Sequence, residues 1–549
     1  MKAWILLALA GCASSTVPAA RFANAPPVQR VADRNDVPQK PAKKPYTQWL
    51  YFFDGHVYGP MRRVLTLDQP LRALGVNSID EVPDSTWFTN RIGARTITPD
   101  EIRAAPGGVG NPERFTPWTI HSTKVGGMSV GFIVSDTRGE KFIVKFDDLG
   151  DPETETGAQI VSGKLLWACG YNVTEDHIAY VRRDDLVLAP DAISEDMFGA
   201  KRKLDRAEVE RKLARVDRGS DGRYRTMVSR FLDGKPLGGH SGVGTRDDDP
   251  NDVIPHERRR DLRGARAIFA WLDHDDIQEG QFLDMWVKDP DDPRRHYVKH
   301  YFLDYGLSLG AMARVTNNLR RSYEYYVDPE IMFDSLTSLG FQDREWSRRQ
   351  APPLRGLGVF ETDAFRPGDW KPLGPAYVPF VTADRFDNYW GAKLVMRFTR
   401  EQLHAAVEGG RYTDPRVVEY LTDALVARQR ATGKYWFSRV SPLEKFRAVD
   451  DDGLCFEDLS IVYGFAPASS TRYALAMHDR DGRRFGPRPT LTASANGTTC
   501  VRIQLASGAE AYTIVRIDTT RPSFHGTTYV HIARAPGTGA PRVIGLWRE

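Results

Sequence analysis

A glycine-rich turn followed by a lysine is the first feature of the sequence that could do chemistry. The turn runs from Gly126 to Gly131 among alternating apolar and polar residues, and Lys145 ends the next alternating stretch. Backbone N–H groups in such a turn can approach anionic oxygens closely, and an ammonium group can neutralise a phosphate. Four residues are therefore candidates for binding nucleotide phosphates: Gly127, Ser129, Gly131 and Lys145.

Three polar residues farther along the chain could supply the remaining parts of phosphoryl transfer. Asp276 closes an acidic run, Gln281 follows five residues later, and Asp304 precedes a Tyr-Gly turn. An aspartate can orient a hydroxyl acceptor, while carboxylate and amide oxygens bind hard cations such as Mg²⁺ or Mn²⁺. Residues of these types could therefore serve an acceptor and a metal ion. Each residue taken alone is more often an ordinary loop residue, so any such role depends on the order in which the residues occur.

Hydrophobic periodicity and turn signals predict the elements that must position these residues. Two or three strands around a glycine turn come first, then one helix, then further strands and a helical half, before a region of short strands. In residue numbers, the expected order is strands at 115–150, a helix at 154–169, strands at 173–188 and 224–232, a loop at 234–252, a helix at 256–272, a strand at 296–303, helices at 397–446 and an all-β module at 449–549.

This order resembles that of atypical kinases of the HipA, CotH and phosphatidylinositol-kinase-like group, over about residues 115–310. From about residue 50 onward, the chain also resembles a family of bacterial lipoproteins that carry the motif Glu-Val-Pro-Asp-Ser-x-Trp-Phe-Thr-Asn-Arg, here 81–91. The resemblance implies an α+β chain with a bilobal protein-kinase-like core and a C-terminal all-β domain. It also implies ATP with Mg²⁺ or Mn²⁺ as cofactors and a protein or small-molecule hydroxyl as acceptor. The implied domains are an N-terminal extension at 46–114, an N-lobe at 115–233 with a charged insertion at 189–222, a helical C-lobe at 234–448 and a β-rich domain at 449–549.

Two residues depart from the kinase-like pattern. The resemblance assigns Asp276 to the acceptor and both Gln281 and Asp304 to a metal ion, and it places Gln159 among the nucleotide-binding residues. Gln281 stands where the resemblance implies a metal-binding Asn, and Gln159 stands where it implies the helical glutamate that pairs with Lys145. Glu155, one helical turn earlier, could substitute for that glutamate. The two departures leave open a second function, that of a catalytically inactive kinase-like scaffold or binding protein.

A serine esterase is a third alternative. Residues 127–131 match the Gly-x-Ser-x-Gly pattern, with Ser129 as the nucleophile. That motif requires a helix directly after the serine, whereas the sequence here predicts a hairpin. The esterase is therefore the least favoured of the three functions.

Other metal sites are weaker alternatives in the sequence. His296, His300 and Asp304 recur at four-residue intervals along one expected strand, but no Cys pair or His-Glu-x-x-His motif supports a zinc site, and we expect His300 to flank the kinase-like cleft. Acidic turns near 247–252 and 479–481 lack the ligand spacing of an EF-hand, so we interpret them as solvated turns.

The N-terminus resembles a lipoprotein signal. Residues 1–12 combine a positive start, an apolar stretch and Leu-Ala-Gly-Cys, which resembles a lipobox with Cys12 as the lipidated residue. Residues 13–45 are proline-rich without apolar periodicity and predict a disordered tether. We therefore expect an exported chain that is lipid-anchored in the cell envelope, at the periplasmic face of the outer membrane or at the cell surface.

Composition excludes one class of partner, and the remaining cysteines predict a disulfide and a core residue. The 75 basic and 72 acidic residues give a net charge of +3, so no electrostatic footprint for nucleic acid is present. Cys455 and Cys500 both lie in the late β-rich region, and we predict a disulfide between them, with two unpaired strand cysteines as the alternative. Cys169 falls in an apolar helical run and is predicted to be a core residue.

Overall fold

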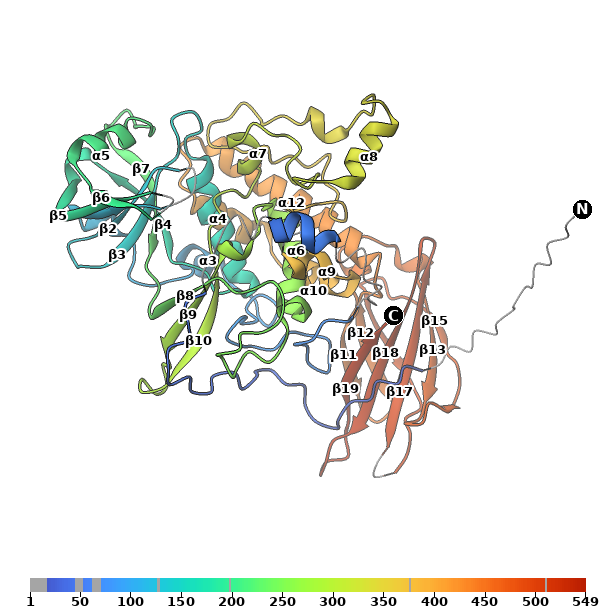
Figure 1. The fold of residues 1–549 in the computed structure, drawn as a ribbon. Coiled ribbons are helices and arrows are strands. Elements are labelled where there is room, and N and C mark those ends of the chain that lie inside the picture. Colours follow the sequence, from blue (N-terminus) through green and yellow to red (C-terminus); the bar gives the residue numbers. More distant parts are fainter. Residues whose placement is uncertain are drawn as a thin grey trace, which may run out of the picture. The chain divides into compact units, whose positions relative to one another are not determined.

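The computed structural model divides the chain into two compact units (Figure 1). It describes residues 17–44, 53–61, 71–125, 129–196, 199–374, 377–508 and 511–549. The larger unit comprises Gln29–Val76 and Val82–Trp436, and the smaller unit comprises Asn77–Glu81, Phe437–Glu549 and the residues up to Val28. The mixed α and β composition predicted from the sequence is confirmed. Among the described residues, no helix combines the length and apolar character that crossing a bilayer requires.

A seven-stranded sheet forms one part of the larger unit. Its strands are β1 (Trp118–Thr123), β2 (Gly131–Ser135), β3 (Lys141–Lys145), β4 (Asp176–Val181), β5 (Leu186–Glu195), β6 (Lys201–Lys203) and β7 (Tyr224–Arg230). Their order across the sheet is β4-β7-β3-β2-β1-β5-β6, and only the β1–β5 pairing is parallel. Alternate residues such as Phe132 and Val134 are fully buried, as the period-two pattern requires.

The charged insertion predicted at 189–222 forms regular secondary structure, and part of it is buried although β6 is exposed. It continues β5, adds β6 and forms helix α5 (Arg206–Leu213), which Asp205 caps by accepting a hydrogen bond from the Glu208 backbone N–H. Leu204, Val209 and Leu213 are buried in the hydrophobic core of the sheet. The high charge density of the segment conceals these apolar positions, which is why the sequence predicts only a charged insertion.

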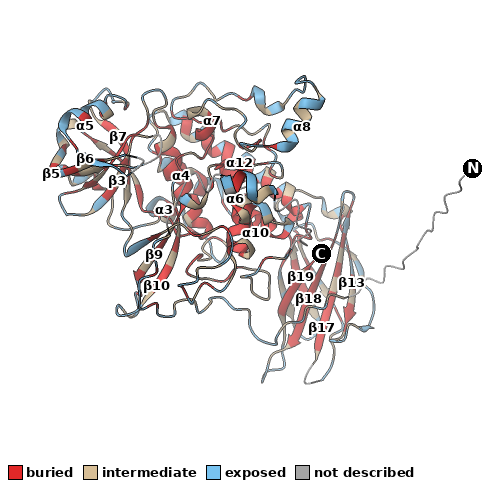
Figure 2. Ribbon diagram, in the orientation of Figure 1, coloured by how far each residue is buried: buried red, intermediate tan, exposed pale blue. Residues whose placement is uncertain are grey.

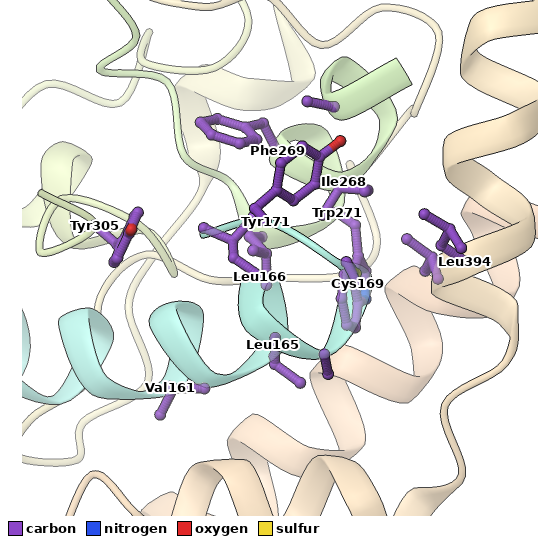
Figure 3. Packing of buried hydrophobic residues seen from close by; sticks show 14 of the residues in the cluster. Val161, Leu165, Leu166, Cys169, Tyr171, Ile268, Phe269, Trp271, Tyr305 and Leu394 are labelled. Atoms are coloured by element: carbon purple, nitrogen blue, oxygen red, sulfur yellow. The ribbon is translucent and has the colours of Figure 1, made fainter. Parts of the chain in front are cut away.

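Helix α4 (Thr154–Cys169) is buried on almost every side. It packs on β4 and β7 and ends at Gly170, whose φ of 131° lies outside the range that side chains favour. Figure 3 shows Val161, Leu165 and Cys169 of this helix within the main hydrophobic cluster, together with residues of α6 such as Trp271. Cys169 is therefore a buried free thiol, as predicted.

A second, three-stranded sheet has the order β10-β9-β8. It contains β8 (Lys235–Gly238), β9 (Phe282–Lys288) and β10 (His296–Phe302), and its core includes Met285 and Tyr297. The sequence predicts only β10 of these three. The loop predicted at 234–252 thus begins with a strand, and β9 was missed because polar Asp284 interrupts its apolar run.

Helices make up the rest of the larger unit. They are α3 (Pro99–Ala104), α6 (Arg260–Leu272), α7 (Ala311–Val315), α8 (Pro329–Thr337), α9 (Val378–Thr382), α10 (Arg385–Met396), α11 (Arg400–Glu408) and α12 (Pro415–Phe437). A side chain at Gly264 of α6 would collide with Trp390 of α10, so this glycine sets how closely the two helices approach. Burial concentrates on α4, α6 and α10, whereas α8 has no buried residue (Figure 2).

The smaller unit is built from two antiparallel sheets. One has the order β11-β12-β16, with β11 (Leu443–Val449), β12 (Gly453–Asp458) and β16 (Thr498–Arg502). The other contains β13 (Arg472–His478), β14 (Arg484–Phe485), β15 (Thr490–Thr492), β17 (Tyr512–Arg521), β18 (Phe524–Arg534) and β19 (Pro541–Arg548), and a short helix, α13 (Leu459–Val462), follows β12. Both sheets contribute to one apolar core, and a disulfide joins the paired residues Cys455 and Cys500. The β-rich domain therefore starts before the predicted position 449, because β11 belongs to it.

The described part of the predicted tether, residues 17–44, makes specific contacts. Within the smaller unit, the Phe22 backbone N–H donates to the Tyr512 hydroxyl. Within the larger unit, Val37 is buried, and its N–H donates to the His296 carbonyl. This segment is extended, as its prolines suggest, but its backbone groups are tied to folded parts of the chain, so it is not the disordered tether that composition predicts. Cys12 lies outside the described residues.

Candidate functional site

The end of β3 and the turn after β10 bring a lysine and an aspartate together. The Lys145 Nζ lies 2.5 Å from the Asp304 Oδ1, although the residues are far apart in sequence. Asp304 has a φ of 58°, a left-handed conformation that aspartate tolerates better than most residues and that turns the chain directly after the strand. The Asp304 side chain is 47% exposed and that of Lys145 is 20% exposed. Solvent, and hence a soluble ligand, can therefore reach this pair.

The Lys145–Asp304 pair keeps both groups charged. Burial lowers the pKa of Lys145, but Asp304 and, more weakly, Asp176 and Glu155 outweigh it and raise that pKa above its ordinary value. Burial likewise raises the pKa of Asp304, but Lys145 outweighs it and holds that pKa below its usual range. At neutral pH the site therefore presents an ammonium beside a carboxylate, which suits the binding of an anion together with a cation.

Asp276 and Gln281 lie next to this pair. The Gln281 Nε2 donates to the Asp276 Oδ2 at 2.9 Å, and the Leu303 backbone N–H donates to the Gln281 carbonyl at 2.9 Å, directly before Asp304. Burial, and then the charge of Asp304, raises the pKa of Asp276 to about 6. The structure thus brings together Asp276, Gln281, Asp304 and Lys145, as the sequence-based assignment requires.

The two crowded carboxylates provide a test of whether a divalent cation fits here. Asp304 raises the pKa of Asp276, which means that their negative charges repel each other. Gln281 already uses its amide nitrogen on Asp276, so its amide oxygen is the atom it can offer to a metal. A hard cation would relieve the repulsion, and the carboxylate of Asp304 and the amide oxygen of Gln281 are the kinds of ligand atom that Mg²⁺ and Mn²⁺ accept, so the donor chemistry fits either ion.

Helix α4 supplies a carboxylate, but not at the position that the pattern predicts. The Gln159 Nε2 donates to the Asp176 Oδ2 at 2.7 Å, and no described contact joins Gln159 to Lys145. Glu155, one turn earlier, interacts electrostatically with Lys145, and burial, followed by the charges of Asp147 and others, raises its pKa to about 7. The structure thus places Gln159 in a buried polar pair and Glu155 facing the site.

The glycine-rich turn is only partly described, and Gly127 lies outside the described residues. Ser129 accepts a hydrogen bond from the Lys124 Nζ at 3.3 Å. A Cβ atom at Gly131 would lie 2.5 Å from the Val144 carbonyl oxygen, so this glycine permits the close pairing of β2 with β3. Strand β2, and not a helix, follows Ser129, and the local geometry of an esterase nucleophile is therefore missing.

Sequence reasoning missed two cations near the site. Burial and the charge of Lys145 lower the pKa of Lys124 to about 8, although Asp304 and Glu155 oppose this shift. Arg321 interacts electrostatically with Asp276. The position of Lys124, directly before the glycine turn, could have indicated its role, but no local pattern links residue 321 to residue 276.

The alternative metal ligands along β10 separate in the structure. His296 stacks on Trp286 with ring centroids 4.0 Å apart, His300 contacts Asp284, and Asp304 contacts Lys145. A set composed of His296, His300 and Asp304 is therefore not assembled, because residues four apart on a strand are too distant to share one ion.

Comparisons with known proteins add little to this geometry. No family model matches the chain, and no curated protein matches it. The chain is similar to a solved chain from the complex of Rio2 kinase with ADP/Mg²⁺ and phosphoaspartate of Chaetomium thermophilum, with 15% identity and a TM-score of 0.19, over 50% of this chain and 71% of that one. The function proposed below therefore depends on the geometry of this chain alone.

Proposed function

We propose that the larger unit binds a nucleotide with Mg²⁺ or Mn²⁺ and transfers a phosphoryl group to a hydroxyl of a protein or small molecule. The observation that carries this proposal is the convergence of Lys145, Asp276, Gln281 and Asp304 from three segments of the chain: the end of β3, the connection from α6 to β9 and the turn after β10. The kinase-like order of strands, helix, strands and helices around them supports it.

Each residue has a task in this proposal. Lys145 and Lys124 bind phosphate oxygens, and Asp304 and Gln281 hold the cation, which when bound supplies positive charge at the transferring group. Asp276 orients the acceptor and takes the proton of its hydroxyl. The acceptor oxygen forms its bond to phosphorus while the bond from phosphorus to the leaving nucleotide oxygen breaks.

A kinase-like scaffold that binds ligand without turnover is the second candidate. The observation that favours it is the engagement of Gln159 with Asp176, since helix α4 then offers Lys145 no carboxylate at the implied position. Glu155 supplies the opposing argument, because it interacts with Lys145 from the same helix. Nucleotide binding is common to both candidates, and only transfer separates them.

We also propose that the protein is lipid-anchored in the cell envelope through Cys12, on the strength of the sequence Leu9-Ala10-Gly11-Cys12. An anchored protein would then need its nucleotide donor to reach the site outside the cytoplasm. Membrane fractionation of the Cys12→Ser protein tests the location independently of the activity.

Calorimetric titration of the chain with ATP, in Mg²⁺ and in Mn²⁺, tests the proposed function. Residues 17–44 should be retained, because they contact both units. Asp304→Asn keeps the size of the side chain but removes the charge beside the cation, and it should weaken metal-dependent binding by at least about tenfold, or ~1.4 kcal/mol. Asp100→Asn, at a carboxylate that is 91% exposed, is the matched control and should bind as wild type does.

Variants on the acceptor side separate an enzyme from a scaffold. Asp276→Asn should bind nucleotide nearly as wild type does but lose transfer to acceptors. Gln281→Asn should strengthen metal binding or raise turnover, because the shorter side chain matches the implied ligand. If the wild type binds no nucleotide with either metal, the proposed function is wrong. If it binds nucleotide but neither the wild type nor Gln281→Asn transfers a phosphoryl group, the scaffold is favoured.

A further inference from the structure

A second cluster of polar side chains lies within the three-stranded sheet of the larger unit. It consists of His240, which follows β8, Asp284 of β9 and His300 of β10. The His300 Nδ1 lies 2.7 Å from the Asp284 Oδ1, and the His240 Nδ1 lies 3.6 Å from that same oxygen. One potential ligand atom from each residue falls within 4.8 Å of the other two.

Strand pairing fixes these positions. The register of β9 and β10 sets Asp284 directly opposite His300, and the register of β8 and β9 pairs Gly238 with Asp284, two residues before His240. The backbone therefore presents two ligands from paired strands and a third from the segment directly after β8. Such a preformed arrangement lowers the entropic cost of binding an ion.

The cluster is withdrawn from solvent. His240, Asp284 and His300 are 2%, 0% and 4% exposed. Trp87 stacks on the His300 ring with centroids 3.5 Å apart, and His300 donates its backbone N–H to the Thr86 carbonyl. The motif at 81–91, which the proposed phosphotransfer site does not use, thus covers one side of this cluster.

Two polar atoms within the cluster lack hydrogen-bond partners among the described residues. They are the His240 Nδ1 and the Asp284 Oδ2. The other nitrogen of His240, Nε2, lies 3.1 Å from the Tyr377 hydroxyl, which fixes the ring so that Nδ1 faces Asp284. A buried polar atom without a partner costs free energy, and a cation between the two atoms would satisfy both.

The charge around the cluster is also negative. Asp249 and Asp252 interact electrostatically with His300, and each has a buried carboxylate oxygen without a described partner. Arg246 is the cation nearest to Asp284, at 3.6 Å from its Oδ2, but it also pairs with Asp248 at 2.8 Å. Asp284 thus shares its guanidinium with Asp248, whereas Asp252 lies 2.7 Å from the His256 Nε2. A divalent cation beside Asp284 would add positive charge to this acidic surrounding.

We propose that His240, Asp284 and His300 bind one divalent transition-metal ion of the zinc class. Two imidazoles and one carboxylate are ligands that zinc accepts, whereas Mg²⁺ and Ca²⁺ prefer oxygen donors alone. Imidazoles that bind a metal commonly use their other ring nitrogen in a hydrogen bond that orients the ring, and the contact from His240 to Tyr377 is of this kind. This proposal stands independently of the phosphotransfer proposal.

The ion would have a structural role, because the cluster is enclosed. Asp284 follows Gln281 by three residues on β9, and His300 precedes Asp304 by four residues on β10. Binding would join β8, β9 and β10 and would thereby hold the strand ends that carry Gln281 and Asp304. Loss of the ion should lower the thermal stability of the protein.

Metal analysis of the purified protein, followed by titration with Zn²⁺ or Co²⁺ after chelation, tests the proposal. We expect about one equivalent per chain, a metal-dependent rise in Tm and, with Co²⁺, a visible absorption band of a nitrogen- and oxygen-ligated ion. His240→Gln and His300→Gln should each lose the equivalent and the rise in Tm. His296→Gln, on the same strand, is the matched control and should retain both.

Two outcomes would overturn the proposal. One is a wild-type chain that takes up neither ion stoichiometrically and shows no change in Tm, which would make the cluster a hydrogen-bonded His–Asp–His group. The other is a full equivalent of metal retained by the double variant His240→Gln/His300→Gln. The wild-type titration needs no substitution, so misfolding of a variant would not leave the question open.

Discussion

The environment of Asp276 predicts how the transfer rate should depend on pH. Its pKa is raised to about 6 by burial and by the nearby charge of Asp304. Only the deprotonated carboxylate can accept a proton from the hydroxyl acceptor. Burial, the larger of the two causes, persists when a cation binds Asp304, so the pKa of Asp276 stays above its ordinary value during turnover. We therefore expect the transfer rate to fall by up to about tenfold per pH unit at a higher pH than the value of about 4 below which an aspartate with an ordinary pKa would lose activity.

A pH–rate profile of the wild type with saturating nucleotide checks this expectation. The raised pKa also means that the folded state holds a proton more tightly than the unfolded state, so ionisation of Asp276 lowers stability as the pH rises through about 6. Asp276→Asn should therefore raise Tm at pH 7.5 while abolishing transfer. A flat profile between pH 5 and pH 7, or a lower Tm in this variant, would contradict the assignment.

At the scale of elements, the sequence predicts those marked by local signals and misses those that depend on contacts between residues distant in sequence. Helix α4 was predicted because its apolar residues and terminal Gly170 are local signals, and the residues around Lys145 and Asp304 were found because they follow predicted strands. Strand β9 was missed because Asp284 interrupts its pattern, and that buried aspartate is partnered by His300, opposite it on β10, and by His240, which follows β8. Partners separated by tens of residues leave no periodicity from which to infer them.

Helix α4 also shows where a pattern and a structure make opposite predictions. By the kinase-like pattern, Gln159→Glu should restore an ion pair with Lys145. In the structure Gln159 is 3% exposed and donates to Asp176, which is 7% exposed, so a carboxylate there would face a second buried carboxylate. We expect this substitution to lower the free energy of unfolding by about 1–3 kcal/mol at pH 7, without tightening nucleotide binding.

Chemical denaturation at pH 7 and pH 5 tests this prediction for Gln159→Glu. The new carboxyl group, or Asp176, would have a raised pKa in the folded state, so the destabilisation should diminish as the pH falls and the pair takes up a proton. Glu155→Gln, on the same helix but facing Lys145, is the comparison and should weaken nucleotide binding with little loss of stability. Tighter nucleotide binding by Gln159→Glu would show that the pattern, and not Asp176, determines the role of this position.

At the scale of the molecule, segments distant in sequence complete the smaller unit. Arg548, which is 1% exposed as a side chain, pairs with Asp80, and the Leu546 N–H donates to the Ser78 carbonyl. Phe22 packs against Gly545, where any side chain would collide with its ring. The domain predicted at 449–549 therefore lacks three described parts of the folded unit: most of β11, Asn77–Glu81 and residues 17–28. No local signal assigns these segments to it, since their contacts are made only after folding.

This arrangement gives the proposed lipid anchor a specific consequence. Cys12 precedes Val17, the first described residue, by five positions, and five residues can span at most about 17 Å. Val17 and Phe22 pack on the core formed by Tyr512 and Ile544, so a lipid on Cys12 would hold the smaller unit close to the bilayer surface.

Cys12→Ser should move the protein from the membrane fraction to the soluble fraction. Cys169→Ser, at a buried thiol, is the control and should leave the protein in the membrane fraction. Accessibility to a protease added to intact vesicles gives a second measurement, because sites in the smaller unit should be cut more slowly in the anchored protein than in the released one. Retention of Cys12→Ser protein after a high-salt wash would show that something other than this cysteine holds the chain at the membrane.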